Sequence, residues 1–316
     1  MSAAGSIETR SGASIVNAMS VDVEDYFQVS AFDRVASRAG WDQFDSRVAR
    51  NTNRLLELFA GAGVRATFFV LGWVAERFPA LVREIAAAGH EVASHGYHHQ
   101  LVFMLTPKQF REDVRDAKRT IEDLIGAPVV GYRAPSYSIV QSSLWALDIL
   151  VEEGYRYDTS IFPIHHDRYG IPGAARHAHV LECQAGRLIE MPASTVQMGG
   201  VNLPIAGGGY FRLLPYAWTQ WGIRRVNRTE RQPVVFYLHP WEIDPDQPRF
   251  RVGAATRSRH YGGLSATASR LARLLHDFRF DSVETVLAGA FATAAVAPSR
   301  AAPAYVPGAA LVAVRK

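Results

Sequence analysis

The chain alternates short apolar runs of strand type with helical patterns, and this alternation limits its fold more than any other feature. The strand-type runs lie at residues 15–22, 66–71, 91–94, 129–132, 155–158, 188–191 and 234–238. Helical patterns lie between them at residues 47–60, 73–88, 107–126, 142–153 and 215–226. Such repeated alternation predicts an α/β fold, built either as an open parallel sheet or as a barrel, and we favour the barrel.

Composition excludes several classes of protein. The chain has 316 residues, of which 48% are hydrophobic and 20% charged, which is enough to bury a large core and argues against disorder. No stretch approaches the roughly 20 apolar residues that span a bilayer, so we expect no membrane span. The 34 basic and 30 acidic residues are spread along the chain and indicate no nucleic-acid partner. The single cysteine, Cys183, cannot form an internal disulfide.

The two ends differ in character from the middle of the chain. Residues 1–14 are small and polar, and we interpret them as a flexible N-terminus that lacks the apolar stretch of a secretory signal. A cytoplasmic location is therefore expected, with the periplasm as the alternative. Residues 15–288 form the expected domain, including a C-terminal extension from about residue 240, and residues 289–316 form an Ala/Pro-rich tail.

Ionisable side chains stand at the ends of five predicted strands. They are Asp22, Glu24 and Asp25 after the first, His95 and His99 after the third, Arg133 after the fourth, Asp158 after the fifth and His239 after the last. Catalytic groups collect at this edge of α/β barrels. Strand-end loops do not need so many ionisable groups for solubility, so the pattern favours an active site.

The histidine spacing indicates a metal site. On a helical turn, the i, i+4 spacing of His95 and His99 places two imidazoles within reach of one ion. Two histidines and one carboxylate leave a position for water, as in catalytic zinc sites. Each residue also has a simpler interpretation: acids are favoured at helix N-termini, Arg133 could form a surface ion pair, and His239 could be a core histidine.

An ordered series of motifs over about residues 20–238 resembles the polysaccharide deacetylases of carbohydrate esterase family 4, the NodB-homology group. The motifs are SVDVED at 20–25, ATFFV at 66–70, SHGYHH at 94–99, RAP at 133–135, YDTS at 157–160 and LHP at 238–240. Within the family, DVEDYFQV, GGGYFR at 207–212 and HPWE resemble the subgroup of exosortase-linked (PEP-CTERM) exopolysaccharide loci. The fold that this resemblance implies is a distorted (β/α) barrel of about seven units.

The resemblance implies a catalytic role for four of these residues. Asp22 would be the general base, oriented by Arg133, and His239 the general acid, positioned by Asp158. The acid is needed because an amide nitrogen is a poor leaving group unless it is protonated.

The resemblance also implies a metal site, with His95 and His99 as ligands. The third ligand is Glu24 or Asp25, because Val23 separates the two acids from Asp22 where the family usually has adjacent aspartates; we favour Glu24. The cofactor expected is a divalent metal, zinc first, with cobalt or nickel as alternatives.

Ser136, Tyr137 and Trp241 are the expected substrate-binding residues. Ser136 stands where the family commonly has a tyrosine that offers its backbone N–H to the oxyanion, so this contact is retained while the pocket wall differs.

The implied function is metal-dependent removal of N-acetyl groups from hexosamine units of an exopolysaccharide or its precursor. The first alternative is hydrolysis of other amides on the same fold, in peptidoglycan or a cyclic amide. The second is a non-catalytic carbohydrate-binding protein that would use the aromatic side chains of Tyr210, Trp218, Trp221 and Trp241.

Overall fold

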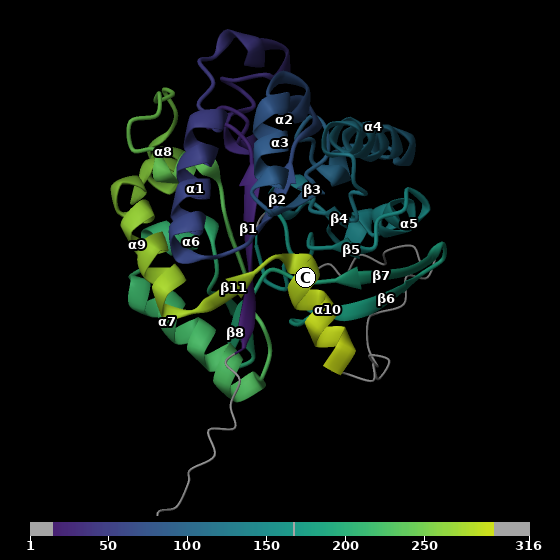
Figure 1. The fold of residues 1–316 in the computed structure, drawn as a ribbon, viewed down its shortest axis with the longest axis vertical. Helices are drawn as coiled ribbons and strands as arrows, with labels where there is room; N and C mark the ends of the chain where they lie inside the picture. The colour runs from purple at the N-terminus through teal and green to yellow at the C-terminus, as the bar shows by residue number, and fades with distance from the viewer. Residues whose placement is uncertain (1–14, 167, 294–316) are drawn as a thin grey trace, which may run out of the picture.

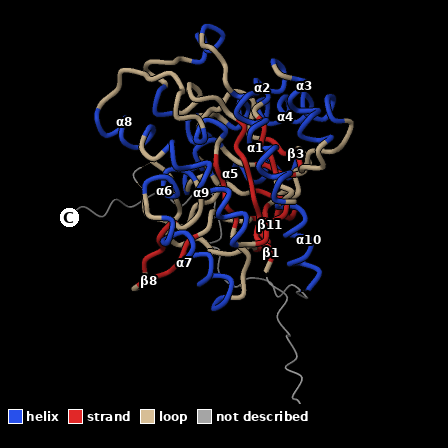
Figure 2. The backbone as a smooth tube through the Cα atoms, turned by 60° about the vertical axis from the view of Figure 1, so that its left-hand side comes forward, coloured by secondary structure: helices blue, strands red, loops and turns tan. Residues whose placement is uncertain are grey.

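In the computed structural model, which describes residues 15–166 and 168–293, a nine-stranded sheet forms the centre of the protein and helices surround it (Figure 1, Figure 2). Seven strands are parallel neighbours, in the order β10 (Val235–Leu238), β1 (Val16–Val23), β2 (Thr67–Val70), β3 (Glu91–Ser94), β4 (Gly131–Tyr132), β5 (Tyr157–Asp158) and β7 (Gly186–Glu190). The antiparallel β6 (His179–Cys183) pairs with β7. The predicted α/β fold is confirmed.

The barrel is distorted between β7 and β10. Within the described residues, the backbone ladder does not continue between these two strands. Instead, the Val235 N–H of β10 donates a hydrogen bond to Ser194 Oγ at 2.8 Å. Gly207, with φ 92°, brings the chain so close to Tyr237 of β10 that a Cβ would lie 2.3 Å from the Tyr237 carbonyl oxygen. A side-chain bridge and a close glycine contact therefore replace ladder pairing at this point.

Helices cover the sheet. They are α1 (Val48–Ala62), α2 (Gly72–Arg77), α3 (Pro79–Ala87), α4 (Pro107–Ile125), α5 (Trp145–Glu152), α6 (Gly208–Leu213), α7 (Tyr216–Arg225), α8 (Ala254–Tyr261), α9 (Leu264–Asp277) and α10 (Val283–Thr293). At the start of α4 the capping box of Thr106 and Gln109 agrees with the predicted boundary, as does Gly126 (φ 66°) at its end. The single helix predicted at 73–88 is wrong, because Pro79 has no N–H to continue α2 and begins α3 instead.

The segment after residue 240 is part of the same fold. Helix α9 packs against α1, with Leu271 and Leu274 fully buried, and β11 (Arg279–Asp281) adds a parallel strand beside β1. The Val283 N–H that begins α10 donates to Thr67 Oγ1 of β2 at 2.7 Å. The predicted tail of residues 289–316 begins too early, because α10 continues to Thr293. The rest of this tail and the predicted flexible residues 1–14 lie outside the described residues. Across the described ranges, no helix combines the length and apolarity that a bilayer crossing requires.

Candidate active site

Strand β1 presents Asp22 to a buried arginine. The Nη1 atom of Arg133, which follows β4, lies 2.6 Å from Asp22 Oδ1, and both side chains are buried. The same nitrogen donates to Ser20 Oγ at 2.9 Å, while Arg133 Nε donates to Thr159 Oγ1 at 2.6 Å. The Phe69 ring lies 4.2 Å from the guanidinium carbon. Arg133 is therefore fixed on several sides, and it in turn fixes the carboxylate of Asp22.

Glu24, His95 and His99 form a buried cluster in which one ligand atom from each lies within 4.8 Å of the others. His95 Nδ1 is 2.8 Å from the backbone oxygen of Arg133. Because a carbonyl only accepts, this nitrogen carries the proton, and Nε2 keeps a lone pair for a cation. Burial lowers the pKa of His95 to about 4, so the imidazole is neutral, as a metal ligand must be.

The contact between Glu24 and His99 also fits a metal ion. Glu24 Oε2 lies 2.6 Å from His99 Nε2, yet this oxygen has no hydrogen-bond partner within the described residues. Burial alone would raise the pKa of Glu24, but the charges of His99 and His239 hold it below its usual range. A buried carboxylate oxygen that faces two imidazoles is the donor set of a divalent cation such as zinc.

The two histidines reach this cluster from a loop, and the predicted helical turn is wrong. Gly96 (φ 74°) and His99 (φ 51°) are both left-handed, which breaks any helix between them. Asp113 of α4 holds the loop by accepting the N–H groups of Tyr97 at 2.9 Å and His98 at 3.2 Å. The i, i+4 spacing thus correctly predicted that His95 and His99 lie close together. They do so because of a loop and not because of a helical turn.

Asp25, the alternative third ligand, lies outside the cluster. Its Oδ2 accepts the Ser46 hydroxyl at 2.6 Å and the N–H groups of Arg47 at 2.8 Å and Val48 at 3.1 Å. These groups belong to the beginning of α1, so Asp25 satisfies helix N–H groups that would otherwise have no acceptor. The simpler interpretation of an acid at a helix N-terminus therefore holds for Asp25.

His239 follows β10 and faces the two acids of β1. Its Nε2 lies 3.8 Å from Asp22 Oδ2 and 3.5 Å from Glu24 Oε1, while its Nδ1 lies 3.0 Å from Glu242 Oε2. Burial alone would lower the pKa of His239, but the carboxylates of Glu24 and Glu242 raise it to about 9. The imidazole therefore carries a proton at neutral pH.

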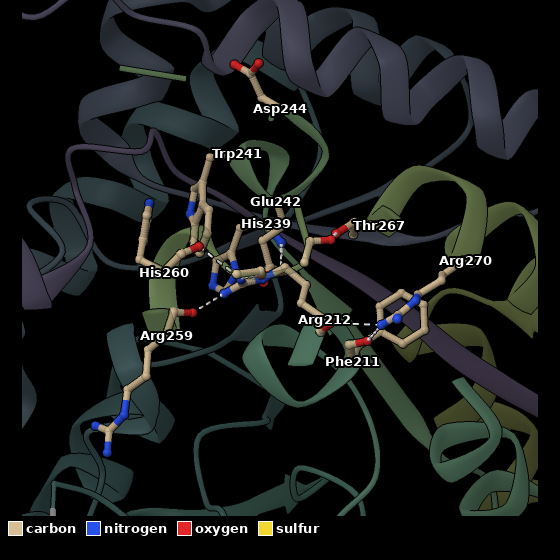
Figure 3. A network of polar contacts seen from close by, with 12 residues as sticks. Phe211, Arg212, His239, Trp241, Glu242, Asp244, Arg259, His260, Thr267 and Arg270 are labelled. Carbon is tan, nitrogen blue, oxygen red and sulfur yellow. Dashed lines mark hydrogen bonds and ion pairs between the residues drawn. The ribbon is translucent and has the colours of Figure 1, made fainter. Parts of the chain in front are cut away.

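Arg212 of α6 supports this arrangement (Figure 3). Its Nε lies 2.6 Å from Glu242 Oε1, and its Nη1 and Nη2 donate to backbone oxygens at the end of α8, those of His260 and Arg259, at 2.9 Å each. Sequence reasoning missed both Arg212 and Glu242 as supporting groups. Their signal was present in GGGYFR at 207–212 and in Glu242 three residues after His239.

Among the contacts of the described residues, none joins Asp158 to His239, the residue that it is expected to position. The described contacts place its carboxylate beside the Ser160 hydroxyl and the Glu190 carboxyl at the end of β7. Burial raises the pKa of Asp158, and burial next to Asp158 also raises that of Glu190. Burial of two neighbouring carboxyl groups disfavours the charged form of each, and Glu242 instead occupies the position beside His239.

The three expected substrate-binding residues have different surroundings. Ser136 (φ 52°) lines an open groove, and its Oγ lies 3.0 Å from Ser30 Oγ. Tyr137 is buried, with its ring 5.8 Å from the guanidinium carbon of Arg133. Trp241 is only 4% exposed, and its Nε1 donates to Glu24 Oε1 at 3.1 Å. In this structure Tyr137 and Trp241 support charged site residues, and Ser136 alone faces open space.

Two family models match adjacent parts of the chain. Residues 39–157 match the model described as "Polysaccharide deacetylase", and residues 159–288 match "Domain of unknown function (DUF3473)". His95, His99 and Arg133 lie in the first segment, whereas His239, Glu242 and Arg212 lie in the second. The two segments therefore build the site together with Asp22 and Glu24, which precede both of them.

Curated relatives and solved structures are similar to parts of the chain or to its fold. A peptidoglycan deacetylase of Helicobacter pylori is 35% identical over 114 residues, which are 36% of this chain and 37% of that protein. A chitooligosaccharide deacetylase of a Bradyrhizobium strain is 30% identical over 99 residues, 31% of this chain and 43% of that protein. The chain thus spans less than half the length of these relatives.

The solved structures share the fold. A Mycobacterium smegmatis structure assigned to the polysaccharide deacetylases has a TM-score of 0.61 at 20% identity, covering 96% of this chain and 99% of that one. The allantoinase PuuE has a TM-score of 0.59 at 15% identity, covering 90% and 92%. The chain is therefore similar to polysaccharide deacetylases over residues 39–157 and to DUF3473 over residues 159–288, and it shares the fold of these solved structures.

Proposed function

We propose that this protein is a metal-dependent hydrolase that removes N-acetyl groups from hexosamine units of an exopolysaccharide or its precursor. The observation that carries the proposal is the buried arrangement around Glu24, His95 and His99. It is bordered by a carboxylate that Arg133 fixes, Asp22, and by a protonated imidazole, His239. A metal-binding cluster with a base and an acid beside it is what amide hydrolysis needs.

Glu24, His95 and His99 would hold the metal, which when bound supplies a Lewis acid for the amide carbonyl and lowers the pKa of water. We assign zinc, because two imidazoles and one carboxylate are a usual ligand set of catalytic zinc. Asp22 accepts the proton of the attacking water, while Arg133 keeps its carboxylate in place. His239 donates its proton to the leaving nitrogen, so that the amine departs neutral. The Ser136 N–H is the backbone donor that we assign to the developing oxyanion.

The substrate assignment has two rivals within amide hydrolysis. The Helicobacter pylori relative is named for peptidoglycan, and the allantoinase with the same fold is named for a cyclic amide. We favour an exopolysaccharide because the GGGYFR and HPWE motifs that set the subgroup apart supply Arg212 and Glu242, which hold His239. A non-catalytic binding protein would have no need of a buried base and a buried acid beside a metal cluster.

The experiment that tests the proposal is acetate release by the zinc-loaded protein. Oligomers of N-acetylglucosamine, cell-wall fragments and allantoin are offered separately to the wild type, to Asp22→Asn and to His95→Ala, and hydrolysis of allantoin, which has no acetyl group, is measured as allantoate formed. We expect release from the oligomers by the wild type, none by Asp22→Asn with its metal content unchanged, and neither activity nor bound metal in His95→Ala. Asp123→Asn on the exposed side of α4 is the matched control. Activity that persists in both site variants would contradict the assignment.

A further inference from the structure

An open groove of about 1010 Å³ borders the site. Three of its lining residues lie within three positions of site residues in the chain: Leu101 is two residues beyond His99, Ser136 three beyond Arg133, and Arg259 immediately precedes His260. The Ser30–Ser136 contact of 3.0 Å joins two walls of the groove. Its volume suits several sugar units, so a chain bound in the site would continue along it.

The groove is strongly basic. Among residues 15–166 and 168–293, four arginines line it, Arg34, Arg168, Arg251 and Arg259, against a single acid, Asp33. All four arginine side chains are exposed, and none forms an ion pair with a carboxylate among residues 15–166 and 168–293. Elsewhere on the surface, arginines such as Arg77 and Arg115 do have carboxylate partners, at 2.6 Å and 2.7 Å. Four guanidinium groups around one cleft, without carboxylate partners in the described part of the chain, raise the local concentration of anions.

The basic wall is connected to the catalytic histidine through the protein. Arg212, which pairs with Glu242, donates through Nη2 to the backbone oxygen of Arg259 at 2.9 Å. Figure 3 shows the side chain of Arg259 leading away from this network, so its backbone is held while its guanidinium stays available. Three of the four arginines belong to the segment that matches DUF3473, and the groove gives this segment a role beyond support of His239.

We propose that the substrate is an anionic glycan, whose carboxylate or phosphate groups, on units next to the N-acetylated hexosamine, bind the arginines of this groove. The proposal rests on the function proposed above and specifies its substrate class. Arginine suits both anions, because its planar fork donates two parallel hydrogen bonds to either. A neutral glycan would use none of the four charges.

The test compares binding and turnover for three probes. They are a chitin hexasaccharide, a hexasaccharide that alternates glucuronate with N-acetylglucosamine, and N-acetylglucosamine linked to a short prenyl diphosphate. Affinity is measured by titration calorimetry and KM by acetate release, each at low and high salt. The variant is Arg34→Gln/Arg251→Gln, and the control is Arg83→Gln/Arg225→Gln, which removes two exposed arginines outside the groove.

We expect one anionic probe to bind more tightly than the chitin hexasaccharide and to lose this advantage at high salt. The groove variant should weaken binding of that probe about tenfold, which is the effect expected from the loss of two exposed charge contacts. Binding of the neutral probe and kcat should not change. The uronate and diphosphate arms distinguish the two sources of charge. Equal binding of all three probes, or equal loss in the control, would overturn the proposal even if acetate is released. Salt-dependent binding without acetate release from any probe would support the groove and contradict the proposed function instead.

Discussion

Arg212 and Glu242 form an almost completely buried ion pair, with Nε 2.6 Å from Oε1 and side-chain exposures of 3% and 1%. The other oxygen of Glu242 accepts from the His239 backbone N–H and lies 3.0 Å from its Nδ1. The positive charge of Arg212 and that of His239 lower the pKa of Glu242 to about 2 although burial opposes this. The orientation of the His239 imidazole therefore depends, through Glu242, on a side chain from α6.

Replacing Glu242 with Gln should reduce kcat about a hundredfold. The His239 imidazole loses its anionic partner, and the leaving amine therefore loses the acid that protonates it. It should also lower the free energy of unfolding by about 3 kcal/mol, since Arg212 is left buried without its counter-charge. Steady-state kinetics and urea unfolding measure the two effects, and Glu57→Gln on the exposed side of α1 is the control. Glu242→Asp keeps the charge and should recover part of the stability. A kcat equal to that of the control would show that Glu242 has no part in catalysis.

Glu24→Gln and Asp25→Asn should have opposite effects. Glu24→Gln removes a ligand of the cluster, so we expect the metal content after dialysis to fall to background. Asp25→Asn weakens the acceptor at the start of α1, and we expect a loss of about 1 kcal/mol in stability with full metal content. Elemental analysis and urea unfolding separate the two. If Glu24→Gln kept its full metal content and Asp25→Asn lost its metal, Asp25 would be the ligand and Glu24 the structural acid.

The sequence predicted the alternation of strands and helices well, because each strand is a short apolar run and several helices carry clear caps. The sequence-based predictions fail where a contact with a residue distant in the sequence decides the local structure. The loop of His95 and His99 is shaped by Asp113, and the orientation of His239 depends on Arg212. No local periodicity reports such contacts.

The candidate site could be predicted as a set of residues but not as an arrangement. Strand ends identified Asp22, Arg133 and His239, which the fold does bring together. The sequence could not separate Glu24 from Asp25, because adjacent residues point to different sides of the chain and only the position of α1 decides which one faces the histidines. The sequence also could not show that Trp241, an expected substrate-binding residue, is buried, because burial is not visible in a residue type.

Trp241→Phe should weaken metal binding about tenfold, because Phe keeps a ring between His239 and His260 but cannot donate to Glu24 Oε1. KM measured at saturating metal should stay close to the wild-type value, since the tryptophan is buried. Competition with a chromophoric zinc chelator gives the metal affinity. Trp221→Phe on α7, where the ring is 39% exposed, is the control. A raised KM with unchanged metal affinity would return Trp241 to the substrate-binding role.

His260→Gln should make the protein less sensitive to acid. The His260 ring stacks on the Trp241 ring, with 4.2 Å between the ring centroids, and His260 Nε2 lies 2.8 Å from Gln247 Oε1. Burial, helped by the charge of Arg212, lowers its pKa to about 3, whereas the unfolded chain binds this proton near pH 6.5. Above pH 6.5, His260 is neutral in both the folded and the unfolded chain and does not affect stability. As the pH falls from there towards 3, only the unfolded chain binds the proton, so the free energy of unfolding decreases by about 1 kcal/mol per pH unit for this group. Urea unfolding between pH 7.5 and 4.5 should therefore show a steeper loss in the wild type than in the variant, and parallel profiles would exclude His260 as the cause.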